Sequence, residues 1–120
     1  MRPGATRAAT LLLTVVLATG LSGCQNIPKS ASVNAFCSAG EKFSASTTFS
    51  QGVSAAKRLE KTGTPGNIPK AARRGFVELV NRVLSSKDGQ DFLKKNKKLT
   101  DAQGRDLMAL TAYIKDTCKL

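Results

Sequence analysis

The sequence predicts an all-α protein, built as a small bundle of four or five helices. Apolar residues recur at the i, i+3, i+4 and i+7 spacing, which collects them on one side of a helix. No stretch alternates apolar and polar residues for long enough to indicate a β-strand. Glycine, proline and helix-capping residues separate the apolar stretches from one another. The 120 residues contain no internal repeat, so we expect one domain.

The first two expected helices cover residues 33–45 and 49–61. Ser32 is placed to cap the first helix, because its hydroxyl can accept a hydrogen bond from an N–H group of the first turn. The stretch 44–50 is rich in serine and threonine, which form helices poorly, and so predicts a break. The apolar stripes are Val33, Phe36, Cys37, Gly40 and Phe43 in the first helix, and Phe49, Val53, Ala56 and Leu59 in the second.

The clearest boundary in the chain is the stretch 62–66, where Gly63 suits the position after a helix and a Pro-Gly pair marks a turn. Asn67 can cap a third helix that has Pro69 in its first turn. Glycine inside a helix costs about 1 kcal/mol relative to alanine, so we expect another helix to approach closely at Gly75. The stripe of this helix is the strongest in the sequence and comprises Ala72, Phe76, Leu79, Val80, Val83 and Leu84.

Two further helices are expected in the last third of the chain. The first is short and covers residues 88–95, where Asp88 and Asp91 favour a helix start because negative charge is stabilised at the N-terminal end. Thr100 opens the last helix, and its spacing from Gln103 fits a capping box. The stripe of the last helix is Leu107, Leu110, Ile114 and Cys118, flanked by Met108 and Tyr113.

The core of such a bundle must consist mostly of leucine, valine, isoleucine and alanine, because aromatic residues are few. The chain has five phenylalanines, one tyrosine and no tryptophan. We expect the phenylalanines to be the bulky anchors of the core, and these are Phe36, Phe43, Phe49, Phe76 and Phe92. A domain this small buries a smaller share of its surface than a large one, so a covalent link would help to stabilise it.

The first 24 residues have the layout of an export signal. Arg2 and Arg7 form a positive start, residues 8–18 form an apolar segment too short to span a membrane, and small residues follow. Leu21-Ser22-Gly23-Cys24 then resembles the lipobox of bacterial lipoproteins. The resemblance implies that residues 1–23 are removed as a signal peptide and that the thiol of Cys24 carries diacylglycerol. The alternative is a secreted protein in which Cys24 stands there by coincidence.

The lipobox resemblance also implies a location and a domain organisation. Two acyl chains suffice for stable membrane anchoring. We therefore expect the mature protein on the outer, extracytoplasmic face of the cell membrane, facing the periplasm if the organism has two membranes. Residues 24–32 would be the lipidated cysteine and a short tether, of which the seven or eight residues after the cysteine reach at most ~28 Å. Residues 33–120 would be a basic helical domain. In outline the chain also resembles small helical lipoproteins of actinobacteria, a likeness that implies no activity.

Lipidation of Cys24 would explain why this exported chain has an odd number of cysteines, three in all. It leaves Cys37 and Cys118, near opposite ends of the mature domain, in a compartment that is not reducing. We expect these two to form a disulfide, which closes a loop of about 82 residues and contributes roughly 4.5 kcal/mol of stability before any strain. The alternative is a pair of buried free thiols.

The chain is strongly basic, with a net charge of +11. Removal of Arg2 and Arg7 leaves 17 Lys+Arg against 8 Asp+Glu. Outside the cytoplasm such a domain meets anionic lipid or anionic wall polymer, and we expect no nucleic acid partner. The alternative is an ordinary solvated surface. The candidate contacts for an anionic surface are Lys57, Arg58, Lys61, Arg73, Arg74, Lys94, Lys95, Lys97 and Lys98.

The sequence indicates no catalytic residues, cofactor or metal site. It contains no histidine, which excludes Ser-His-Asp and Cys-His sites within this chain, and its eight carboxylates are scattered. We therefore expect a non-enzymatic interaction or binding module of the cell envelope, with an unknown envelope protein among its partners. An exposed apolar groove around Phe76 or Phe92 would favour this function. A closed core with evenly spread charge would instead favour a structural or surface-charge role. A pocket that collects carboxylates with a serine or lysine would favour an enzyme.

Overall fold

The computed structural model describes residues 26–119, and the predicted all-α fold is confirmed over that range. The described part of the chain forms five helices and no strand. The helices are α2 (Val33–Ser44), α3 (Phe49–Thr62), α4 (Lys70–Leu84), α5 (Gly89–Lys97) and α6 (Asp101–Cys118). Residues 1–25 and Leu120 lie outside the described residues, so the predicted export segment and the lipidated Cys24 do too.

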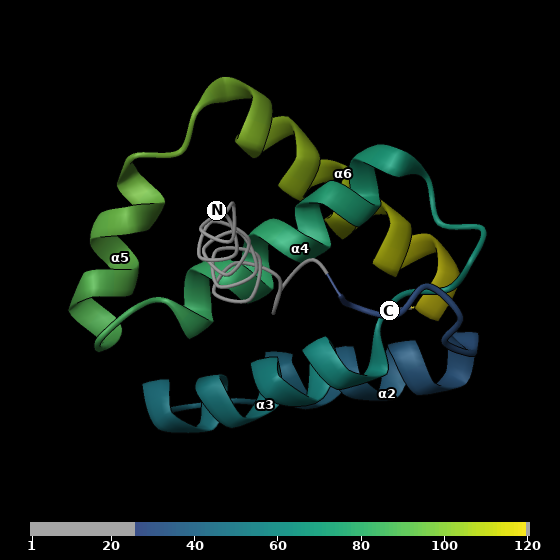
Figure 1. Ribbon diagram of the computed structural model, residues 1–120, viewed down its shortest axis with the longest axis horizontal. Helices are drawn as coiled ribbons and strands as arrows, with labels where there is room; N and C mark the ends of the chain where they lie inside the picture. The colour runs from purple at the N-terminus through teal and green to yellow at the C-terminus, as the bar shows by residue number, and fades with distance from the viewer. Residues whose placement is uncertain (1–25, 120) are drawn as a thin grey trace, which may run out of the picture.

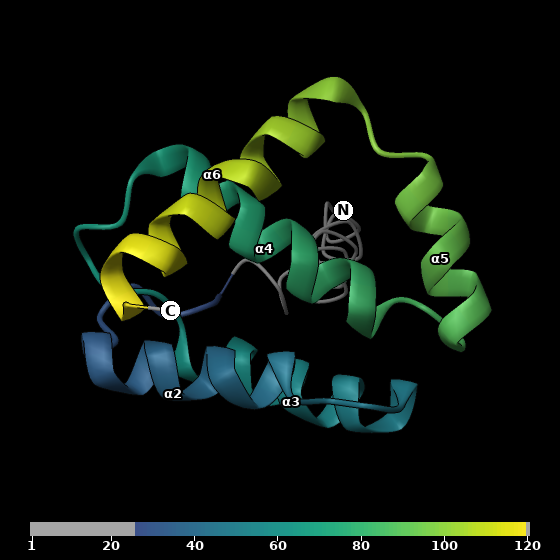
Figure 2. The same cartoon turned by 180° about the vertical axis from the view of Figure 1, so that it is seen from behind.

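Four of the helices form a bundle, and α5 stands at one end of it (Figure 1). α2 and α3 lie side by side and run in opposite directions, while α4 and α6 cross on one side of them (Figures 1 and 2). α4 packs most extensively against α6 and also contacts α3, and α2 contacts both α3 and α6. α5 makes its main contacts with α4, and these are few.

The core lies where α2, α4 and α6 meet. Phe36 of α2, Phe76 and Val80 of α4 and Leu110 of α6 are all buried there. The ring centroid of Phe36 lies 5.8 Å from that of Phe76 and 5.8 Å from that of Tyr113. Burial of each large apolar side chain in this cluster stabilises the fold by roughly 1.5–3 kcal/mol.

The close helix approach predicted at Gly75 is confirmed where α4 crosses α6. A Cβ atom at this position would overlap the backbone carbonyl of Asp106 and would meet the Cβ atom of Leu110 at 3.1 Å. The intrinsic cost of a helical glycine is thus offset by the close packing that it permits. Any residue with a side chain at this position would push the two helices apart.

The predicted disulfide is confirmed. Cys37 of α2 is bonded to Cys118 of α6, with the two Cα atoms 5.5 Å apart. Both cysteines are half-buried and pack against the core. The bond therefore joins the first and last helices of the described chain beside the main apolar cluster.

Most helices begin where the local sequence supplies a cap. The capping side chains are Ser32, Thr48, Asp88 and Thr100, and Thr100 forms the predicted capping box with Gln103. The predicted cap at Asn67 is wrong. α4 begins only after Pro69, whose carbonyl accepts the first helical hydrogen bond from the backbone N–H of Arg73 at 3.0 Å, and no side chain caps this helix.

Residues 27–31, which the sequence assigns to a tether, are packed against the domain, and we call them the docked segment. Ile27 is only 3% exposed and belongs to the core. The backbone N–H of Thr64 donates to the carbonyl of Pro28 at 3.0 Å, and the N–H of Ala31 donates to the carbonyl of Thr64 at 3.1 Å. The chain is therefore attached to the domain from Ile27 onward.

Arg73 holds the docked segment in place from α4. Its guanidinium donates to the carbonyls of Ile27 at 2.7 Å and Pro28 at 3.0 Å, and to the hydroxyl of Thr64 at 2.9 Å. Gly63 adopts a left-handed φ of +80°, and a Cβ atom there would overlap the backbone of Pro28. The glycine that ends α3 thus also makes room for the docked segment.

Candidate functional site

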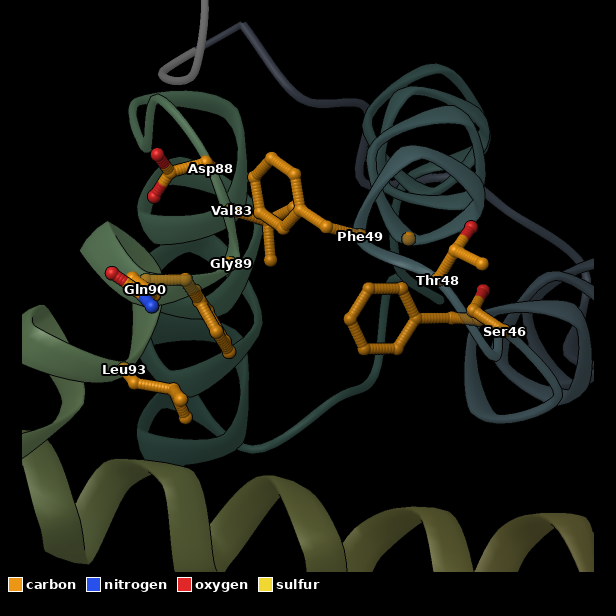
Figure 3. A pocket seen from close by; sticks show the side chains of 11 residues that line it. Ser46, Thr48, Phe49, Val83, Asp88, Gly89, Gln90 and Leu93 are labelled. Carbon is orange, nitrogen blue, oxygen red and sulfur yellow. The ribbon is translucent and has the colours of Figure 1, made fainter.

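An apolar groove of about 720 Å³ opens between α5 and the junction of α2 with α3 (Figure 3). Its apolar wall is made by Phe43 near the end of α2, Phe49 at the start of α3, Val83 near the end of α4, and Phe92 and Leu93 of α5. The Leu93 side chain is 58% exposed. The groove is therefore an open, apolar surface in the part of the bundle where α5 stands apart.

Polar groups surround this apolar wall. Gln90 and Leu93 project from α5 on one side of the groove, while Ser46 and Thr48 lie on the other (Figure 3). Asp88 also lines the groove, but its carboxylate accepts a hydrogen bond from the backbone N–H of Asp91 at 2.9 Å as the cap of α5. The rim thus offers hydroxyl and amide groups and one carboxylate that is already engaged.

The expectation that all five phenylalanines anchor the core is wrong for Phe49 and Phe92, whereas Phe43 lines the groove and also packs against the core cluster. These three are half-buried and line the groove, whereas Phe36 and Phe76 are buried. The spacing along the chain gives the apolar side of the helices, except that Val33, predicted on the stripe of α2, is 43% exposed. The groove exists because α5 does not close over α3, so the apolar sides of these helices remain partly open.

α5 is attached to α4 mainly by polar contacts, because none of its residues is buried. Arg82 of α4 is only 9% exposed and donates to the carbonyl of Lys95 at 2.7 Å, near the end of α5. Arg82 also forms an ion pair with Glu78, which accepts a hydrogen bond from the side chain of Gln103 at 3.3 Å. One buried arginine therefore joins α4 to α5, and its partner carboxylate reaches α6.

The other end of the α5 attachment depends on Asp91. Its carboxylate accepts a hydrogen bond from the backbone N–H of Lys87 at 2.9 Å and lies 3.4 Å from the ammonium of Lys95. The hydrogen bond from Lys87 and the charge of Lys95 lower the pKa of Asp91. Lys95 also donates to the carbonyl of Ser85 at 2.8 Å, so it serves the fold as well as the surface.

The basic residues predicted from the sequence do not form one patch. Lys57, Arg58 and Lys61 are exposed on α3, and a second exposed group is at the end of α5. Arg58 and Lys42 line a hollow of about 540 Å³ that adjoins the groove. The exposed residues at the end of α5 are Lys94, Lys97 and Lys98.

A second hollow of about 480 Å³ lies beside the docked segment. We call it the basic hollow, and its lining includes Lys29, Ile68, Lys70, Arg73 and Arg74. Arg73 is committed to the docked segment, and burial lowers the pKa of its guanidinium. The sequence singled out Arg73 and Arg74, but it missed Lys29 and Lys70, because single lysines far apart in a chain give no local signal.

Arg74 has a partner across the α4–α6 crossing. Its guanidinium makes two hydrogen bonds to the carboxylate of Asp106, at 3.0 and 3.1 Å, and these bonds raise the pKa of Arg74. Lys29 and Lys70 are exposed and make no ion pair with any residue that the structure describes. The two lysines are thus the uncommitted charges of the basic hollow.

The groove predicted as one sign of a binding module is present around Phe92. Around Phe76 there is instead a narrow space of about 180 Å³, which is lined by Phe36 and the two disulfide cysteines as well. Residues 26–119 contain no group of three or more histidine, cysteine, aspartate or glutamate residues placed to hold a metal ion. In the same range no helix is both long and apolar enough to cross a membrane.

Comparison with models of known families, with curated proteins and with solved structures found no match for this chain.

Proposed function

We propose that the chain is a membrane-anchored extracytoplasmic lipoprotein that serves as a non-enzymatic binding module of the cell envelope. The anchor rests on the likeness of Leu21-Ser22-Gly23-Cys24 to a lipobox. The binding function rests on one observation, the open apolar groove at α5. Large apolar surfaces are expensive to leave in water, so an exposed apolar groove is typical of a binding site.

The position of the groove supports binding of a partner away from the membrane. α3 starts with Phe49 in the wall of the groove and ends with Thr62 beside the docked segment. At 1.5 Å per residue its 14 residues separate these two ends by about 20 Å. The docked segment leads to the anchor, and α5 stands at the opposite end of the bundle (Figure 1). With the anchor on Cys24, this arrangement would direct the groove toward the envelope rather than toward the bilayer of the anchor.

The partner that fits this groove is the apolar side of an amphipathic helix from an envelope protein. Such helices place residues spaced by three and four positions into apolar grooves. The adjoining hollow, which shares Ser46 with the groove, is lined by Lys42 and Arg58 and contains no carboxylate. Because complementary charge orients a partner and speeds its association, the polar side of the bound helix is expected to be acidic.

Photocrosslinking in intact cells tests this proposal. A photoreactive phenylalanine analogue replaces Leu93 at the groove or Met108, which is 73% exposed on α6 and serves as the control. We expect one discrete protein adduct from position 93, none from position 108, and loss of the adduct when Phe92→Asp places a charge in the groove. Mass spectrometry should map the adduct to an acidic amphipathic helix. Equal labelling from both positions would contradict the groove function.

The anchor is tested separately by intact mass of the protein from the membrane fraction. We expect a chain that begins at Cys24 and carries diacylglycerol, and we expect Cys24→Ala to prevent the modification. An unmodified Cys24 would contradict the anchor and leave the groove proposal to the crosslinking result. If the anchor is found but no partner occupies the groove, a surface-charge role in the envelope becomes the better function, based on the exposed lysines of α5.

A further inference from the structure

The docked segment fixes which end of the domain faces the membrane, provided that Cys24 is lipidated as proposed. The backbone around Ile27 is held by hydrogen bonds to Thr64 and Arg73 and cannot swing freely. At up to ~3.6 Å per residue, the three peptide steps from Cys24 to Ile27 can span at most about 11 Å. A lipid on Cys24 would thus hold this end of the domain within that distance of the bilayer surface.

This same end carries the basic hollow. The hollow is lined by residues of the docked segment and of the start of α4. Every charged side chain in its lining is basic, and none is a carboxylate. Lys29 of the docked segment and Lys70 of α4 both line it and have no described ion-pair partner. The N-terminal end of α4 adds partial positive charge, since no side chain caps it. A half-buried Ile68 supplies an apolar contact.

We propose that this end of the domain is its membrane-docking surface, seated on the anionic headgroups of the bilayer that holds the anchor. Lys29 and Lys70 contact the headgroup phosphates, and Arg73 positions the surface by fixing the docked segment. Two observations select this occupant: the short length of chain between Ile27 and Cys24, and the purely positive lining of the hollow. This orientation places α5 at the far end of the bundle from the membrane (Figure 2), so the groove that α5 lines would face the envelope.

The exposed lysines of α5 are the matched comparison. Lys94 and Lys97 are exposed, like Lys29 and Lys70, and carry the same charge, but they belong to α5, at the end of the domain remote from the docked segment. A docking surface set by geometry depends on the first pair alone. A general attraction between a basic protein and an acidic membrane depends on both pairs equally. The two explanations can therefore be separated by neutralising two lysines at one end of the domain or two lysines at the other.

Hydrogen exchange on the lipidated mature chain in vesicles tests the proposal. The chain is compared in phosphatidylcholine vesicles and in vesicles with 30% phosphatidylglycerol, after intact mass has established the lipid on Cys24. We expect slower exchange in residues 28–31 and 64–72 in the anionic vesicles, reversed by 0.5 M salt, with the groove residues 46–52 unchanged. One lysine near an acidic surface is worth about five-fold in association, so Lys29→Gln with Lys70→Gln should remove the slowing.

The control is Lys94→Gln with Lys97→Gln, which should retain the slowing in full. Equal slowing in the neutral vesicles, or equal loss with both pairs of substitutions, would overturn the docking surface. Inorganic phosphate added to the neutral vesicles should have no effect. If it slowed exchange at the same residues, the hollow would bind free phosphate and the membrane assignment would be wrong. Because lipidation is verified in the same sample, a negative result here is distinct from a failure of the anchor.

Discussion

The two ends of this domain are built on different principles. At the anchor end, the docked segment, α2, α4 and α6 enclose buried apolar side chains and are joined by the Cys37–Cys118 disulfide. At the groove end, α5 buries none of its residues and is held by hydrogen bonds and charge from Arg82 and Asp91. Under the proposed function, the first end would secure a fixed position on a membrane. The second leaves apolar surface open for a partner. In this account, the buried core and the disulfide stabilise one end of the small bundle, and the open groove at the other end binds a partner.

The disulfide should contribute as much to the stability of the anchor end as any single buried side chain. Replacing Cys37 and Cys118 together by alanine should lower the free energy of unfolding by about 4 kcal/mol, because the unfolded chain gains the freedom of a loop of about 82 residues. Urea unfolding of the non-lipidated Cys24→Ser chain measures this. A loss below about 1 kcal/mol would mean that the apolar core alone secures this end.

The same substitution at the two ends gives the sharpest contrast. Phe76→Ala removes a buried ring and should cost about 4 kcal/mol, whereas Phe92→Ala removes a half-buried ring from the groove and should cost about 1 kcal/mol. Urea unfolding of the two variants measures the difference. Equal costs would show that the groove end is as tightly packed as the core.

The attachment of α5 should depend on one buried arginine. Arg82→Gln loses the charged donor to the carbonyl of Lys95 and the ion pair with Glu78. We expect α5 to open more easily by about 2 kcal/mol, the value of a hydrogen bond to a charged group. Amide exchange of residues 89–97 should accelerate while that of α2 stays unchanged. Faster exchange throughout the molecule would instead show that Arg82 stabilises the whole domain and not only the attachment of α5.

The smallest effect should be a loosening of α5 in acid. The folded domain lowers the pKa of Asp91, so this carboxylate contributes stability above its unfolded pKa of about 3.9 and loses the contribution as the pH falls through its lower folded value. Below about pH 4, the protection of the Lys87 amide, which is its intrinsic exchange rate divided by the observed rate, should therefore decrease. The Asp91→Asn variant should lack this acid response, and an unchanged response in that variant would assign it to another group.

The sequence was sufficient for the features that depend on neighbouring residues. Apolar spacing and caps located the helices, Gly75 marked the close crossing of α4 and α6, and the three cysteines led to the correct pairing. The error at Asn67 arose because Pro69 delays the helix start. The helices and caps depend on residues close together in the chain, and three cysteines allow very few pairings. Both kinds of feature can therefore be inferred without the fold.

The candidate sites could not be inferred in the same way. Periodicity gives the apolar side of Phe49 and Phe92 but does not say whether another helix covers it, so both were assigned to the core. Lys29 and Lys70 become neighbours only because the docked segment folds back on the start of α4. The charge of Arg73 predicts a surface contact, whereas in the structure its guanidinium donates hydrogen bonds to the backbone carbonyls of Ile27 and Pro28. Each of these depends on contacts between distant parts of the chain.

The central claim is that one end of the domain faces the bilayer and the other faces a protein partner. Photocrosslinking of the lipidated chain in intact cells, with the photoreactive residue at position 70 or at position 93, tests both halves in one measurement. The claim predicts phospholipid adducts from position 70 and a discrete protein adduct from position 93. Phospholipid adducts from position 93, with none from position 70, would contradict it.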